Sequence, residues 1–284
     1  MGSSSLQEEV AAALGGAVAS SRPVAGGDIN QAQEMVLADG RVVFVKSNQQ
    51  AQATMFAAEA RGLAWLAEAQ ALRVPRVLHV AERFLVLEHL QSGRRRPDFD
   101  ESLGRGLAAL HRFGSPGFGL DHDNFIGRLP QANASAPTWA EFYRERRLEP
   151  QLRLARQAGL CSPSLARGFE RLFAVLEDRV GPPEPPARLH GDLWGGNLMG
   201  DEAGAPCLID PAVYGGHREV DLAMMRLFGG FSPRVFSAYE EAWPLAAGYE
   251  ERLPLYQLYF LMAHVNLFGR SYLAQAEHAL RSTI

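Results

Sequence analysis

Lysine is almost missing from this chain of 284 residues. Of its 28 lysine and arginine residues, Lys46 alone is a lysine. Arginine replaces lysine at most surface positions, but its planar guanidinium is a poor substitute where a compact ammonium is needed. Lys46 is therefore a candidate functional residue. The opposing interpretation is chance, because any one of the 28 basic positions can be the exception.

Cysteines and long apolar runs are also scarce. Cys161 and Cys207 are too few for a disulfide framework, so we expect a reduced, cytoplasmic protein. No apolar run reaches the roughly 18 residues of a membrane span, and the first residues lack the basic and apolar segments of a signal peptide. A net charge of −4 argues against nucleic-acid binding. At 47% hydrophobic residues, the chain can bury one large core or two closely packed lobes.

The most informative stretch is RLHGDLWGGNLM, residues 188–199. Asp192 follows His190 by two residues, and Asn197 follows Asp192 by five. This is the spacing of the protein-kinase catalytic loop, with Gly191 in place of the usual arginine. In that loop the aspartate accepts the proton of the attacking hydroxyl, and the asparagine holds a magnesium ion. The spacing makes Asp192 a candidate base and Asn197 a candidate metal ligand.

Asp210 completes this group. It follows the short apolar run 206–209, which predicts a strand, and the turn-forming residues 200–204 predict a hairpin. A hairpin brings Asn197 and Asp210 together, as shared binding of magnesium requires. A lone His-Gly-Asp or Asp-Pro is more often chance or a turn. The whole set in this order favours phosphoryl transfer.

The segment before Lys46 has the layout of a kinase nucleotide site. Strands are predicted at 33–37 and 41–46, and the second ends at Lys46. Gly26 and Gly27 precede them as a weak glycine-rich loop that, taken alone, is an ordinary turn. The helix predicted over 52–71 carries Glu59, 13 residues after Lys46. A helical glutamate is usually solvated, but a kinase lysine needs such a partner.

A lobe boundary is predicted after residue 90. Strands at 74–80 and 83–87 lead into Glu88, His89 and Leu90, the position of a kinase hinge whose backbone binds adenine. We therefore expect an N-lobe of residues 1–90 and a C-lobe of residues 91–284. Helices are predicted at 99–113, 139–158 and 165–180, and another is predicted to begin within 214–223. The aromatic residues of the tail are expected to lie mostly in the core.

Seven short segments carry a resemblance to a known family. They are GGDIN at 26–30, FVK at 44–46, FAAEA at 56–60, DNFIG at 123–127, HGDLWGGN at 190–197, IDPA at 209–212 and GHREVDLA at 216–223. In this order the chain resembles the fructosamine kinase, or ketosamine-3-kinase, family over nearly its whole length. The GDIN and DLWGGN segments distinguish it from the related aminoglycoside phosphotransferases and choline kinases.

The resemblance implies an α+β, two-lobed, protein-kinase-like fold with a small antiparallel-sheet N-lobe, one long helix in it and a mainly helical C-lobe. It implies ATP-dependent phosphorylation of the sugar 3-hydroxyl of a ketosamine, with Mg²⁺ as cofactor, followed by release of the amine. The implied roles are as follows: Asp192 is the base, Asn197 and Asp210 are the metal ligands, and Gly26, Gly27, Lys46, Glu59, Glu88, His89 and Leu90 bind the nucleotide. A glycated amine or protein is the expected partner, and a monomer the expected state.

Two other functions fit the same motifs. An aminoglycoside or choline kinase uses the same ATP machinery and differs only on the acceptor side, which we map to 117–127, the helix from Trp139 and 214–218. A non-catalytic nucleotide-binding pseudokinase is the second alternative. The presence of Lys46, Asp192 and the two metal-ligand candidates argues against it.

Overall fold

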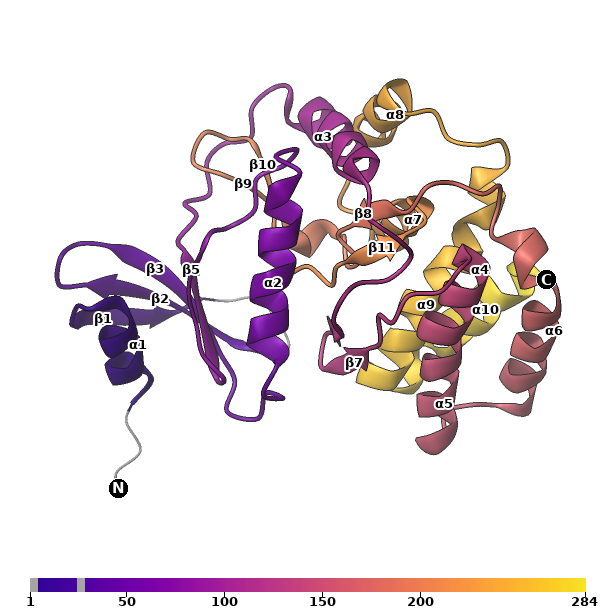
Figure 1. Ribbon diagram of the computed structural model, residues 1–284, viewed down its shortest axis with the longest axis horizontal. Helices are drawn as coiled ribbons and strands as arrows, with labels where there is room; N and C mark the ends of the chain where they lie inside the picture. The colour runs from indigo at the N-terminus through magenta and orange to yellow at the C-terminus, as the bar shows by residue number, and fades with distance from the viewer. Residues whose placement is uncertain (1–4, 25–28) are drawn as a thin grey trace.

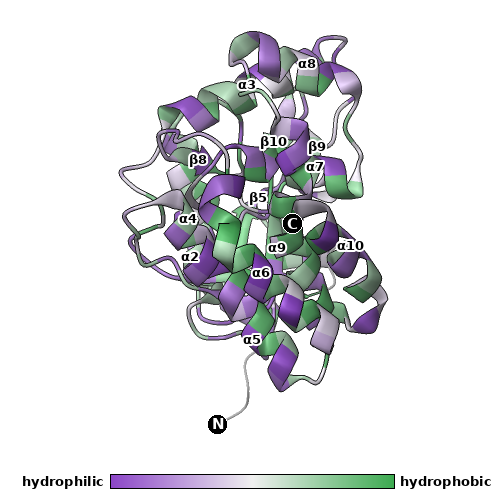
Figure 2. Cartoon of the chain, turned by 90° about the vertical axis from the view of Figure 1, so that its right-hand side faces the viewer, coloured by the Kyte–Doolittle hydropathy of each residue, from purple (hydrophilic) through white to green (hydrophobic). Residues whose placement is uncertain are grey.

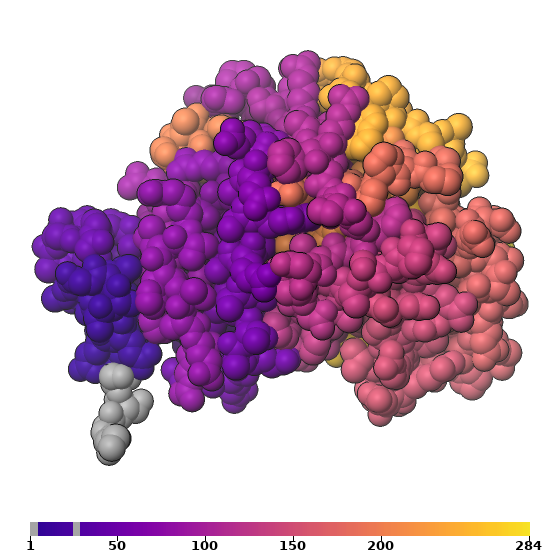
Figure 3. Space-filling view, in the orientation of Figure 1, coloured from indigo at the N-terminus to yellow at the C-terminus, as the bar shows by residue number. Residues whose placement is uncertain are grey.

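A five-stranded sheet and a larger, mainly helical part divide the computed structural model, which describes residues 5–24 and 29–284 (Figure 1). The sheet and two helices come from the first third of the chain. In the space-filling view this indigo-to-purple part occupies one side, and the later residues occupy the other (Figure 3). The predicted α+β class is confirmed.

The sheet is antiparallel throughout, in the order β1-β2-β3-β5-β4. Its strands are β1 (Val18–Pro23), β2 (Gln31–Leu37), β3 (Val42–Ser47), β4 (Val77–Val80) and β5 (Phe84–Glu88). Strand β5 is buried along most of its length, as its continuous apolar run predicted. Gly26 and Gly27, the predicted glycine loop, lie outside the residues that the structure describes.

Two helices accompany the sheet. Helix α1 (Leu6–Leu14) begins with a capping box in which the side chains of Ser5 and Glu8 each accept the other's backbone N–H. Helix α2 (Met55–Glu68) is shorter than the predicted 52–71. Its apolar face buries Phe56, Leu63 and Leu66 against residues of both parts of the molecule. This packing fixes the position of Glu59 on α2.

The remaining chain is mainly helical. Its helices are α3 (Phe99–Phe113), α4 (Trp139–Phe142), the π-helix η1 (Tyr143–Leu148), α5 (Glu149–Gln157), α6 (Pro163–Arg179), α7 (Glu219–Phe228), α8 (Pro233–Ala242), α9 (Tyr249–Phe268), the 3₁₀-helix η3 (Arg270–Tyr272) and α10 (Leu273–Thr283). Helix α9 is apolar around most of its circumference and packs among α5, α7 and α10 (Figure 2). An all-round apolar helix is expected at the centre of a core.

Three small antiparallel pairs shape the region between the sheet and the helices. They are β6 (Asn124–Ile126) with β7 (Leu129–Gln131), β8 (Ala187–Leu189) with β11 (Tyr214–Gly216), and β9 (Leu198–Gly200) with β10 (Pro206–Leu208). The hairpin predicted around 200–204 is thus confirmed. A 3₁₀ turn, η2 (Gly195–Asn197), leads into β9.

A helix does begin within 214–223, as predicted, but only in the second half of that segment. Residues 214–216 pair with β8, and α7 begins only at Glu219. Gly215 explains the difference, because a Cβ there would lie 2.1 Å from the carbonyl oxygen of Gly117. A glycine that lets another backbone approach so closely is typical of an extended crossing rather than of a helix.

The β9–β10 turn is tied to the chain that leaves the sheet. The guanidinium of Arg73 lies 3.0 Å from the Asp201 carboxylate, and the N–H of Gly93 donates to the Asp201 carbonyl at 3.0 Å. The hairpin that carries the predicted metal ligands is thereby fixed relative to the end of β5. Among the helices of residues 5–24 and 29–284, none is long and apolar enough to cross a membrane.

Candidate active site

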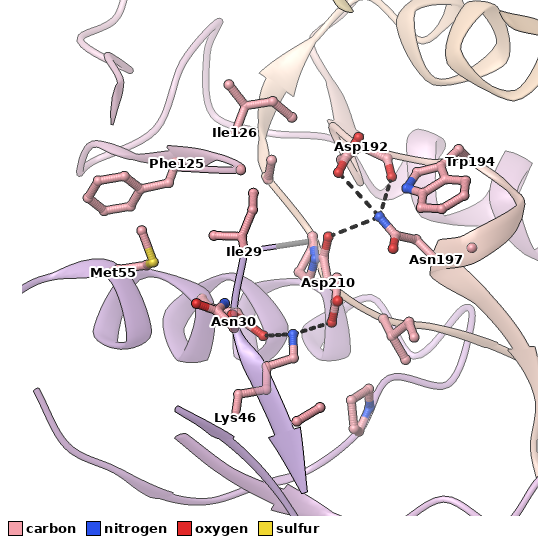
Figure 4. Close-up of a pocket in the computed structure, with 18 of the residues that line it drawn as sticks. Ile29, Asn30, Lys46, Met55, Phe125, Ile126, Asp192, Trp194, Asn197 and Asp210 are labelled. Carbon is pink, nitrogen blue, oxygen red and sulfur yellow. Dashed lines mark hydrogen bonds and ion pairs between the residues drawn. The ribbon is translucent and has the colours of Figure 1, made fainter. Parts of the chain in front are cut away.

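A cavity of about 890 Å³ lies between the sheet and the helical part. Its lining includes every predicted site residue that the structure describes: Lys46, Glu59, Glu88, His89, Leu90, Asp192, Asn197 and Asp210. These residues come from segments that are up to 164 positions apart. Figure 4 shows several of them converging on one region of the cavity.

Lys46 lies between two carboxylates at the end of β3. Its Nζ donates to Glu59 Oε1 at 2.7 Å and to Asp210 Oδ1. Burial alone would lower the pKa of Lys46, but the charges of Glu59 and Asp210 outweigh it and raise the pKa above its usual value. The ammonium therefore stays charged, as a group that binds phosphate must.

Asp192 and Asn197 are joined by a side-chain amide. Asn197 Nδ2 donates to the Asp192 carbonyl at 2.8 Å, and it lies 3.3 Å from Asp192 Oδ2 and 3.4 Å from the Asp210 carbonyl (Figure 4). Burial, with the charge of Asp210, raises the pKa of Asp192 to about 7. A carboxylate with a raised pKa is a better proton acceptor than a solvated one.

The Asp221 side chain of α7 holds the backbone of the two residues before Asp192. The N–H groups of His190 and Gly191 donate to its two carboxylate oxygens at 2.8 and 2.9 Å. His111 Nε2 lies 3.1 Å from the same carboxylate. Gly191 has φ +81°, and a Cβ there would lie 2.0 Å from the Ala212 carbonyl oxygen. Asp221 therefore braces this loop through its backbone.

The predicted hinge residues turn their side chains elsewhere. Glu88 accepts from Arg76 Nε at 2.9 Å, and His89 Nε2 lies 2.8 Å from Glu34 Oε2. Among the described residues, the N–H and C=O of Leu90 make no backbone hydrogen bond. Backbone groups with free donor and acceptor positions at the edge of the cavity are suited to bind a planar heterocycle.

Two oxygen atoms at the site fit a hard cation. The contacts above use Asn197 Nδ2 and Asp210 Oδ1. Within the described ranges, Asn197 Oδ1 and Asp210 Oδ2 have no hydrogen-bond partner. The described part of the chain contains no cluster of three or more His, Cys, Asp or Glu side chains that could hold a metal. Magnesium bound through one carboxylate, one amide and substrate phosphates needs no such cluster.

Part of the cavity lining is aromatic. It consists of Trp194 and of Phe228, His264, Phe268 and Tyr272, which lie in or next to α7, α9 and η3. The predicted acceptor segments are therefore partly wrong. Trp139 and residues 214–218 are buried in the core, and of 117–127 only residues 124–127 reach the cavity lining.

The tail aromatics were predicted to be mostly core, which holds for Tyr239, Tyr256, Tyr259 and Phe260. Phe268 and Tyr272 line the cavity instead. No local signal separates the two groups, because aromatic side chains at helical spacing are equally consistent with either.

A solved kinase structure shares this fold. The choline kinase LicA from Streptococcus pneumoniae matches 98% of this chain and 97% of its own with a TM-score of 0.66, at 13% identity, which shows a shared fold alone. The fold is therefore that of the protein-kinase-like phosphotransferases.

The family follows from closer matches. The fructosamine kinase family model matches residues 3–284, and the chain belongs to this family. A Thermobifida fusca structure described as a fructosamine-3-kinase has a TM-score of 0.91 at 39% identity and covers 99% of both chains. A Synechocystis protein named as a probable ketoamine kinase is 43% identical over 269 residues, 93% of this chain and 90% of that one. The chloroplastic protein-ribulosamine 3-kinase of Arabidopsis thaliana is 38% identical over 263 residues, 89% of this chain and 79% of that one.

Proposed function

We propose that this protein transfers the γ-phosphoryl group of ATP to the sugar 3-hydroxyl of a ketosamine. The observation that carries the proposal is the amide of Asn197. Its nitrogen links the backbone of Asp192 and Asp210, and its oxygen has no partner among the described residues. A base and two oxygen ligands in one cavity are the parts that phosphoryl transfer needs. Family membership supports the ketosamine as acceptor.

Each site residue has one role in this proposal. Lys46 neutralises non-bridging phosphate oxygens and is held in position by Glu59. Asp192 orients the acceptor hydroxyl and takes its proton. Because the transition state of phosphoryl transfer is loose, positioning and charge stabilisation supply most of the acceleration. Residues 1–90 would bind the nucleotide, with Gly26 and Gly27 over the phosphates and Glu88, His89 and Leu90 at adenine. Residues 91–284 would hold the acceptor.

Asn197 and Asp210 would hold Mg²⁺ through Oδ1 and Oδ2. Magnesium held there would supply positive charge to offset that of the nucleotide phosphates. The chain's own contribution is to fix the two oxygens, through the β9–β10 pairing and the bond from His190 Nε2 to the Ile209 carbonyl at 2.9 Å.

Phosphorylation at the 3-hydroxyl would turn a stable adduct into one that decomposes. Enolisation of the C2 carbonyl toward C1 gives an enaminol in which the C3 phosphate is allylic. The nitrogen lone pair then expels inorganic phosphate, and water hydrolyses the resulting imine, which frees the amine. The proposed physiological consequence is deglycation of an amine or of a protein.

The test is ADP release with Mg-ATP and a panel of acceptors: fructose-lysine, ribulose-lysine, kanamycin, choline and none. The D192N variant is the control, because it keeps the shape of the side chain but cannot take a proton. Stimulation by a ketosamine that disappears in the variant supports the proposal. Stimulation only by kanamycin or choline would overturn the substrate and leave the kinase. ATP binding without ADP release would contradict the catalytic role.

A further inference from the structure

Four aromatic rings form one wall of the cavity, and we call Phe228, His264, Phe268 and Tyr272 the aromatic wall. His264 is at its centre, with ring centroids 4.7 Å from Phe228, 5.4 Å from Phe268 and 4.9 Å from Tyr272. Phe228 and Phe268 are 37% and 42% exposed, which is unusual for large apolar side chains. A cluster of exposed aromatic rings inside a cavity marks a binding surface.

The wall is connected to the loop that carries Asp192. Trp194 follows that residue by two positions, and its indole lies against Gly196, where a Cβ would be 2.2 Å from the ring. Gly195 packs against the segment after Phe228, since a Cβ there would lie 3.2 Å from the Gly229 carbonyl oxygen. The wall and the transfer centre therefore share one cavity lining, with Trp194 beside the predicted base.

The aromatic wall carries no carboxylate. In the part of the chain that the structure describes, the acidic residues of the cavity are Glu59, Glu88, Asp192 and Asp210. The first two are paired with basic side chains, and the last two form the transfer centre. Apart from Lys46, the described lining contains no lysine or arginine. A polycationic acceptor would need several carboxylates and an anionic one would need arginines, so the wall suits neither.

Ring faces attract alkylammonium ions through their quadrupoles, and aromatic clusters that bind such ions need no carboxylate. His264 adds one directional contact. Its Nδ1 lies 2.8 Å from the Phe260 carbonyl, which can only accept, so Nδ1 carries the hydrogen and Nε2 has a free lone pair. Burial lowers the pKa of His264, which keeps that lone pair available. Nε2 of His264 can therefore accept a hydrogen bond from an ammonium N–H. A quaternary ammonium has no N–H and cannot make this contact.

We propose that the aromatic wall binds the alkylammonium group of the acceptor and that His264 Nε2 accepts its N–H. This inference rests on the proposed function and deepens it. A ketosamine carries one secondary ammonium next to its sugar, whereas an aminoglycoside carries several charges and choline has no N–H. The wall thus selects a singly charged, N–H-bearing ammonium, and it does so without an ion pair.

The experiment measures KM for three acceptors with the same sugar: N-butyl-fructosamine, its quaternary N,N-dimethyl derivative and the uncharged 1-O-butyl-fructose. The F268L variant removes a ring but keeps an apolar side chain. It should raise KM for the secondary amine about five- to tenfold, the size of a cation–π contribution, with KM for ATP unchanged. KM for the ether should change less than about twofold. F113L, at an exposed phenylalanine outside the cavity lining, is the matched control and should leave all three values unchanged.

His264 is tested separately. H264Q keeps an acceptor near the position of Nε2 and should retain preference for the secondary over the quaternary amine, while H264L should abolish it. Equal losses for amine and ether in F268L would overturn cation recognition, and so would unchanged preference in H264L. Failure of the unmodified protein to phosphorylate any ketosamine would instead overturn the proposed function and this inference with it.

Discussion

Lys46 on β3 and Glu59 on α2 form an ion pair of 2.7 Å that joins the sheet to its long helix. Both side chains are nearly buried, and Asp210 from the other part of the molecule contacts the same ammonium. A compact group with three donors suits this position. A guanidinium is planar and larger, so it cannot place one nitrogen at the same point.

We therefore expect K46R to fold but to lose about 100-fold in kcat, the usual cost of removing one preorganised electrostatic contact. Steady-state ADP release with a ketosamine measures the loss, and thermal unfolding checks that the variant is folded. R41K, at an exposed residue of the β2–β3 turn, is the control. Near-normal turnover of K46R would remove the argument from the single lysine.

Asp221 is expected to position the catalytic loop rather than to react. D221N replaces one of its oxygens by a donor that faces a backbone N–H, so it should lower the free energy of unfolding by about 2–4 kcal/mol. It should also lower kcat, because Asp192 lies directly after the two amides that Asp221 holds. Urea unfolding and turnover test both effects. D178N, on the exposed face of α6, should change neither; a D221N protein with normal turnover would contradict the positioning role.

Arg252 and Glu219 form a bidentate pair with N···O distances of 2.6 and 2.8 Å, in which the Glu219 side chain is fully buried. R252M should lower the free energy of unfolding by about 3–5 kcal/mol, because a buried carboxylate is left without its partner. The loss should be smaller at pH 5 than at pH 7, since the uncompensated carboxylate then binds a proton.

The double variant R252M/E219Q should recover part of this loss, because no buried charge remains. R234M, which removes the surface ion pairs of Arg234 with Glu101 and Glu241, is the control and should cost less than about 1 kcal/mol. A double variant as unstable as R252M alone would show that packing, and not charge, dominates at this position.

His217 should make stability depend on pH. Burial, with the nearby charges of Arg252 and Arg218, lowers its pKa from 6.5 to about 4. Between pH 6.5 and 4 the unfolded chain binds this proton and the folded protein does not. The free energy of unfolding is therefore unaffected by His217 above pH 6.5, and it decreases by about 3 kcal/mol as the pH falls toward 4.

The H217N variant isolates this contribution. Its amide oxygen can still accept the Glu219 N–H, which donates to His217 Nδ1 at 3.3 Å, but it does not titrate. Urea unfolding at pH 7, 5.5 and 4 should show the free energy of unfolding falling less steeply in H217N than in the parent. Parallel pH profiles would contradict the assignment.

The residues that we propose for nucleotide binding and phosphoryl transfer could be predicted because their signals are local. Asp192, Asn197 and Asp210 lie within 19 residues, and the turn residues 200–204 predict the hairpin between Asn197 and Asp210. Lys46 and Glu59 are separated by a short loop and the first turn of α2, so a contact between them follows from the short connection. The structure places all five around one cavity.

The acceptor side was not predictable in the same way. Phe228, His264, Phe268 and Tyr272 come from α7, α9 and η3, and no short pattern connects them. Tyr259 and Phe268 belong to the same apolar helix, yet one is 1% exposed and the other 42%. That difference depends on the residue at which α9 leaves the core, and the sequence of α9 does not indicate that residue.

The sequence by itself determined the family, through seven short segments that resemble it. It also predicted the α+β class and the residues that we propose for the transfer centre, because these depend on local periodicity and on side-chain chemistry at fixed spacings. The tertiary structure decided which aromatic residues face the cavity and that 214–216 form a strand. Both depend on contacts between segments far apart in the chain, where packing overrides the preference of each segment taken alone.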